Sequence, residues 1–85
     1  MKVLFPSQLL SYTHTTQLQV EGGTLAEVLA VFDRQFPGIR FRIIDEQDEI
    51  SLHIRIFINQ EITRSLQYEL QSEDKIRIIG AINGG

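Results

Sequence analysis

The residues best suited to chemistry are the last two of the sequence, Gly84 and Gly85. Glycine has no side chain, so a pair of glycines is slim and can adopt backbone angles that other residues avoid. Such an end could carry the α-carboxylate of Gly85 down a narrow channel into the active site of another protein. The alternative is an inert, frayed terminus, which is common at chain ends. The rest of the sequence has to decide between a working tail and an inert one.

No other group of residues has the pattern of a catalytic or metal site. The sequence has no cysteine, which excludes disulfides, thiolate metal ligands and cysteine nucleophiles. His14 and His53 are isolated, and no serine or threonine is spaced as a nucleophile with its base. The acidic run 45–49 could bind a cation or a docking partner, but it lacks EF-hand spacing and favours a solvated loop. We therefore expect no bound metal or cofactor, and no catalysis by this chain alone.

Length and composition indicate one small domain in a soluble protein. The 85 residues have room for one core, and 42% hydrophobic and 22% charged residues are ordinary values. The net charge is −3 and the basic residues are scattered singly, which argues against nucleic-acid binding. The first apolar run ends at Pro6, too early for a signal peptide, and no later stretch could span a membrane. A cytoplasmic protein is expected.

The elements that must position the tail begin with two strands and a helix. Lys2–Phe5 and Thr16–Val20 are predicted strands, separated by a predicted loop over residues 7–16. Thr24 and Glu27 have the spacing of a capping box, which marks the start of a helix. The helix should end at Pro37-Gly38. Its apolar stripe consists of Leu25, Val28, Leu29 and Phe32.

The second half of the sequence predicts strands joined by turns, and no further helix. Leu52–Ile58 alternates, so Leu52 and the isoleucines at 54, 56 and 58 should share one buried face. Asn59–Glu61 is a predicted turn and Ser65–Leu70 a weak strand. A second predicted turn, 72–74, leads into the last strand, Lys75–Ile79, which runs directly into the tail.

One helix across a mixed sheet of four to five strands is the economical way to bury the helical stripe. The first and last strands should lie side by side in the centre of that sheet. The order of elements is that of an α+β, ubiquitin-like β-grasp fold. We expect a domain over residues 1–79 and a flexible tail over residues 80–85.

With this order and its terminal glycines, the chain resembles the ubiquitin-like sulfur carriers of thiamin, molybdopterin and cysteine biosynthesis. The resemblance covers nearly the whole length and is best at Phe36–Ile39, Ile56–Asn59 and Lys75–Gly85. The long linker after the predicted helix, with its acidic Asp45-Glu46, looks closer to the molybdopterin and cysteine-pathway members than to the shorter thiamin carrier.

Three positions differ from the usual family pattern. Asn59-Gln60 replaces Asn-Gly, and Ser72–Asp74 replaces Asp-Gly-Asp, so both turns lack a glycine that would permit positive φ. Ile79-Gly80 stands where many members have proline, which predicts a more flexible tail.

The resemblance implies chemistry at Gly85. An E1-like adenylating enzyme would use ATP to form a Gly85 acyl-adenylate, and a sulfur donor would convert it to a thiocarboxylate for an acceptor enzyme. Because the sequence ends at Gly85, no protease should be needed to expose it. This chain would bind no cofactor of its own. The tail residues that would enter the partner's channel are Gly80, Ala81, Ile82, Asn83 and Gly84.

Docking is expected on the sheet face opposite the helix, where an apolar and basic patch should lie beside the tail. An ordinary solvated face is the alternative. The predicted partner-binding residues are Arg55, Phe57, Lys75, Arg77 and Ile79.

Several functions remain open. The Ala81–Gly85 ending is slightly closer to the cysteine-biosynthesis carriers, and the small subunit of molybdopterin synthase is nearly as good a match. The sequence is also compatible with a protein modifier joined to lysines through Gly85, and with an interaction domain whose tail is inert. It names neither the acceptor, the activating enzyme nor the sulfur donor.

Overall fold

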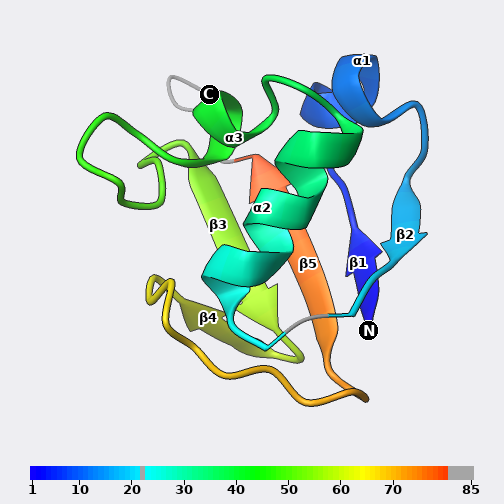
Figure 1. Ribbon diagram of the computed structural model, residues 1–85, viewed down its shortest axis with the longest axis vertical. Helices are drawn as coiled ribbons and strands as arrows, with labels where there is room; N and C mark the ends of the chain where they lie inside the picture. Colours follow the sequence, from blue (N-terminus) through cyan, green and yellow to red (C-terminus); the bar gives the residue numbers. More distant parts are fainter. Residues whose placement is uncertain (22, 81–85) are drawn as a thin grey trace.

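The sheet has five strands in the order β2-β1-β5-β3-β4 (Figure 1), in a computed structural model that describes residues 1–21 and 23–80. The strands are β1 (Lys2–Leu4), β2 (Gln17–Gln19), β3 (Ile54–Ile58), β4 (Glu61–Thr63) and β5 (Lys75–Gly80). The first and last strands lie side by side at the centre, as predicted, and they pair in parallel with Lys2 opposite Lys75. The other neighbouring strands are antiparallel. This is the predicted β-grasp fold.

The long helix α2 (Leu25–Gln35) crosses one face of the sheet (Figure 1). Its predicted capping box is present: the Thr24 hydroxyl accepts from the Glu27 amide at 3.2 Å, and the Glu27 carboxylate accepts from the Thr24 amide at 2.8 Å. These bonds satisfy amide groups that the first helical turn leaves without backbone partners. The helix ends before Gly38, whose φ of 94° is a left-handed angle that favours glycine.

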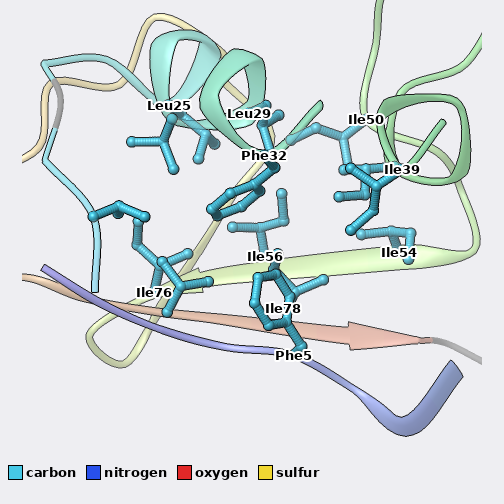
Figure 2. Packing of buried hydrophobic residues seen from close by; sticks show 14 of the residues in the cluster. Phe5, Leu25, Leu29, Phe32, Ile39, Ile50, Ile54, Ile56, Ile76 and Ile78 are labelled. Atoms are coloured by element: carbon cyan, nitrogen blue, oxygen red, sulfur yellow. The ribbon is translucent and has the colours of Figure 1, made fainter. Parts of the chain in front are cut away.

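The core lies between α2 and the sheet (Figure 2). Figure 2 shows Leu25, Leu29 and Phe32 facing Ile56, Ile76 and Ile78 of the central strands. Phe32 has no exposed surface, and its ring meets Phe5 edge-on with centroids 5.3 Å apart. The helical stripe and the alternating isoleucines therefore fold onto one another, as their periodicities predict.

Among the described residues, three short helices lie outside the predicted elements. The predicted loop over 7–16 contains the 3₁₀ turn η1 (Ser7–Leu9) and α1 (Leu10–Thr13), and the linker after α2 contains α3 (Arg40–Ile43). Leu9 and Ile43 are buried. The turn η1 and the helix α3 thus each place one apolar side chain in the core, whereas the buried residue of α1 is Thr13.

Three predictions about the second half differ from the structure. Leu52 is 76% exposed rather than buried, because a turn at Ser51 delays the start of β3 until Ile54. The edge strand β4 falls at Glu61–Thr63, partly on the predicted turn. The predicted strand Ser65–Leu70 forms, within the described part of the chain, only a single bridge, between Thr24 and Glu69.

The hairpin between β3 and β4 needs no glycine. Ile58 pairs with Glu61, which leaves a two-residue loop in which Asn59 has a φ of 59°. Asparagine tolerates this region better than most residues. Its side chain also donates to the Asp74 carboxylate at 3.0 Å and accepts from the Lys75 amide at 3.1 Å. Asn59 thus joins the hairpin to the turn that precedes β5.

Candidate functional site

The tail is attached to the central strand of the sheet. β5 includes Gly80, one residue more than the predicted strand, and Gly80 pairs with Ile54 of β3. Because β1 and β3 flank β5, its course is determined by pairing with these two neighbours. The predicted channel and reactive residues Ala81, Ile82, Asn83, Gly84 and Gly85 lie outside the described residues, so their roles stay predictions.

The five predicted docking residues share the face that points away from α2. Phe57 is paired with Arg77, and Arg55 with Ile79. The residues between them, such as Ile56 and Ile78, are buried under the helix, so alternation turns the docking residues outward. Lys75 is exposed on the same face by the same alternation.

Arg77 and Phe57 are in direct contact on this open face. The guanidinium carbon of Arg77 lies 5.4 Å from the centre of the Phe57 ring, within the range of a cation–π contact. The contact holds an aromatic ring and a positive charge together at the surface. Both residue types are frequent among the residues that dominate protein–protein binding energy or interface composition.

Sequence reasoning missed two apolar residues that extend this face. Ile62 of β4 is 53% exposed and lies opposite Phe57, and the half-buried Leu4 of β1 lies opposite Arg77. Ile62 was missed because its segment was not predicted as a strand. Leu4 could have been found from the alternation of the first strand. A continuous row, which we call the open-face row, therefore crosses four strands: Leu4, Arg77, Phe57 and Ile62.

Arg55 connects the open face to the base of the tail. Its Nη1 donates to the Leu52 carbonyl oxygen at 2.8 Å and to the Ile54 carbonyl oxygen at 3.3 Å. Ile54 is the pairing partner of Gly80. The guanidinium group is thereby held near the point at which the tail leaves the sheet, at the opposite end of β5 from Lys75.

The acidic run serves local structure. One carboxylate oxygen of Asp45 accepts from the amides of Gln47 and Glu49, at 2.8 and 3.0 Å, and Asp48 forms an exposed ion pair with Arg40. Within residues 1–21 and 23–80, no three histidine or acidic side chains are grouped so that they could hold a metal ion. In the same part of the chain, no helix has the length and hydrophobicity required to cross a membrane.

Comparison with known proteins identifies one family and several solved structures of similar fold. The model of the ThiS family matches residues 3–85. No curated protein matches the sequence significantly. Among solved structures, CysO from Mycobacterium tuberculosis is 22% identical with a TM-score of 0.88, covering 95% of this chain and 98% of that one.

Two further structures are similar over almost their whole lengths. The Amycolatopsis orientalis BexX/CysO complex contains a chain that is 24% identical with a TM-score of 0.89, covering 99% of this chain and 98% of that one. Small archaeal modifier protein 1 from Methanosarcina acetivorans is 26% identical with a TM-score of 0.84, and the match covers 99% of this chain and 94% of that one. The family match spans nearly the full sequence, and the fold and the strand order agree with it. The chain therefore belongs to the ThiS family of ubiquitin-like sulfur carriers.

Proposed function

We propose that this protein carries sulfur as a thiocarboxylate at the α-carboxyl group of Gly85. The observation that carries the proposal is the Gly84-Gly85 end, which follows the central strand β5 by only a few residues in a member of the ThiS family. The chain would be a protein co-substrate, and the catalytic residues would belong to its partners.

The chemistry begins with an activation step. A carboxylate is a poor acyl donor because its leaving group would be oxide. An adenylating enzyme would let a Gly85 carboxylate oxygen attack the α-phosphorus of ATP, releasing pyrophosphate and giving an acyl-adenylate. Sulfide then attacks the carbonyl carbon, AMP leaves, and a thiocarboxylate remains. If the donor is a persulfide, the first product is an acyl disulfide, and a second thiol must reduce it to release the thiocarboxylate.

Partner recognition is proposed for the open face. Phe57 and Ile62 supply apolar surface, while Arg77 and Arg55 supply positive charge on the same side. A buried aromatic contact with a charged rim is a common arrangement at protein interfaces. The position of Arg55 beside Ile54, the partner of Gly80, would let the partner hold the sheet and receive the tail at once.

The proposed partners are an E1-like adenylating enzyme, a sulfur donor and an acceptor enzyme. Support for a protein partner comes from the CysO relative, which was crystallised in a complex with BexX. The absence of cysteine from the sequence fits a reducing compartment, so we propose a cytoplasmic location. Within the family, we favour cysteine biosynthesis, with the small subunit of molybdopterin synthase as the alternative.

A second candidate function has its own support. The relative from Methanosarcina acetivorans is a small archaeal modifier protein, and it is 26% identical to this chain. A modifier would use the same adenylate, but a lysine amine of a target would attack the carbonyl carbon and an isopeptide bond would form. The two functions therefore share the activation step and differ in the nucleophile.

Reconstituted activation tests the proposal. The full chain is incubated with ATP, sulfide and the adenylating enzyme of the same source, and the C-terminal peptide is weighed. We expect one oxygen to be replaced by sulfur. A chain that lacks Gly84 and Gly85 is the control and should stay unmodified, although it retains the whole sheet. Adenylation followed only by transfer to lysines would support the modifier instead, and no adenylation would refute both.

A further inference from the structure

The last residue of β5 is covered by a side chain from the other end of the protein. Along β5, Ile76 and Ile78 point into the core with at most 2% of their surface exposed. Alternation places Gly80 on the same side. Glycine brings no side chain to that place, and Gln8 of η1 occupies it.

The amide group of Gln8 lies against the Gly80 backbone. A Cβ atom added to Gly80 would be 2.7 Å from both Cδ and Nε2 of Gln8 and 3.0 Å from Oε1. These distances are shorter than ordinary van der Waals contacts, so any larger residue at this position would displace the amide. Since all three atoms lie within 3.0 Å of that one point, the whole amide group covers the Cα atom of Gly80.

The backbone at Gln8 is held in place by its neighbours along the chain. Leu9 is 2% exposed, and its amide donates to the Pro6 carbonyl oxygen at 3.0 Å, which forms the η1 turn. The backbone of Gln8 is therefore fixed while its side chain remains exposed. The amide group has both donors and an acceptor, and it lies directly beside the start of the tail.

Within the described residues, the sheet supports Gly80 on one side only. The pairing of β1 with β5 ends at Leu4 and Arg77, whereas the pairing of β3 continues to Ile54 and Gly80. The chain has no proline here, which would restrict the backbone through its fixed φ. Gln8 is thus the side chain placed to restrict Gly80 from the core side.

We propose that Gln8 is a positioning residue: its side-chain amide packs on Gly80 and sets the direction in which the C-terminal tail leaves the sheet. The inference rests on the proposed function, because the direction matters only if a partner enzyme must receive the tail. Correct placement of a reacting group lowers the barrier by reducing the entropy lost on reaching the transition state. In this proposal, the open-face row binds the partner, and Gln8 sets the direction in which the tail presents the Gly85 carboxylate.

Steady-state adenylation separates these two roles. With the adenylating enzyme of the same source, pyrophosphate release is measured against carrier concentration for the wild type, Gln8→Ala, Gln8→Glu and Gly80→Ala. We expect Gln8→Ala to lower kcat roughly tenfold with KM unchanged, because docking is intact and only tail placement is lost. Gln8→Glu has the same shape and should keep a kcat close to that of the wild type.

Gly80→Ala should act through the same contact. A Cβ at position 80 would push the Gln8 amide off the backbone into solvent, so kcat should fall as in Gln8→Ala with little effect on the melting temperature. The double variant Gln8→Ala/Gly80→Ala should be no worse than either single variant, because both remove one shared interaction. In the wild type, a nuclear Overhauser effect is expected between the Gln8 side-chain amide hydrogens and the Gly80 α-hydrogens.

The outcomes distinguish this inference from the function on which it rests. If the wild type is not adenylated, the sulfur-carrier proposal fails and this inference fails with it. If the wild type is adenylated and Gln8→Ala has an unchanged kcat, the inference alone is refuted. A lower melting temperature with an unchanged kcat, or a missing Overhauser effect, would likewise reduce Gln8 to an ordinary surface residue.

Discussion

Phe57 and Arg77 are cross-strand partners whose side chains meet on the face that α2 leaves open, with the Arg77 guanidinium carbon 5.4 Å from the centre of the Phe57 ring. The pair lies in the middle of the open-face row, between Leu4 and Ile62. On the proposed function, this pair lies at the centre of the surface that an adenylating enzyme would bind.

Phe57→Ala should weaken docking without changing the chemistry. Truncating a central aromatic residue of an interface commonly costs about 2 kcal/mol or more, which corresponds to about a thirtyfold rise in KM for the carrier. The kcat should not change, because the tail is untouched. Steady-state adenylation measures both constants.

Arg77→Ala and Arg34→Ala form a matched pair for the same assay. Both variants lose one exposed arginine, but Arg34 lies on α2, on the opposite side of the sheet. We expect KM to rise for Arg77→Ala only. Equal effects of the two variants would mean that net charge, rather than the open face, governs binding.

Phe32→Ala should be one of the most destabilising single substitutions in the core. The side chain is fully buried and packs edge-on against Phe5, so truncation leaves a cavity and should cost about 3–5 kcal/mol of unfolding free energy. Phe41→Ala is the matched control, because Phe41 is 81% exposed and should change stability by less than about 0.5 kcal/mol. Urea unfolding measures both, and similar losses would contradict the packing described above.

Asp74 should make stability depend on acidic pH. The Gln71 amide, and after it the Asn59 side chain, donate hydrogen bonds to the carboxylate and lower the pKa of Asp74 below its usual 3.8. A pKa that is lower in the folded state means that the contribution is fully present above about pH 4 and is lost as the pH falls through the folded value.

The comparison of Asp74→Asn with the wild type tests this dependence. The difference in unfolding free energy should be constant near neutral pH and should shrink as the pH falls below about 4, since protonation removes the charge from the wild type as well. Glu73→Gln, at the exposed neighbouring position, should show a smaller dependence. If the difference in unfolding free energy between Asp74→Asn and the wild type does not vary with pH, the hydrogen bonds to the Asp74 carboxylate do not stabilise the fold in this way.

The sequence predicted those parts of the fold whose patterns are long or chemically specific. The helix was predictable because Thr24 and Glu27 have capping-box spacing and the apolar stripe follows at helical period. The central, adjacent placement of the first and last strands followed from the order of elements. Phe57 and Arg77 could be placed on one face because alternation in β3 and β5 is strict.

Other features depend on contacts between distant residues. The strand β4 is defined by its pairing with β3, in which Ile62 lies opposite Phe57. The three residues of β4 are too few to show an alternation that would predict a strand. In the sequence, Leu52 continues the alternation of β3. In the structure, the Ile54 amide donates a hydrogen bond to the Ser51 carbonyl oxygen, and this turn keeps Leu52 out of the strand. The packing of Gln8 on Gly80 joins opposite ends of the chain, and no local signal in either segment indicates it.

The mass of the C-terminal tryptic peptide tests the central claim most directly. Cleavage after Arg77 releases Ile78–Gly85, which contains the proposed reactive carboxyl group and no methionine, so oxidation of Met1 cannot be mistaken for sulfur. From protein isolated in its native host, we predict a peptide in which one oxygen is replaced by sulfur, with the change lost after hydrolysis. A peptide that keeps its ordinary carboxylate, even after the adenylating enzyme, ATP and sulfide have been supplied, would contradict the account.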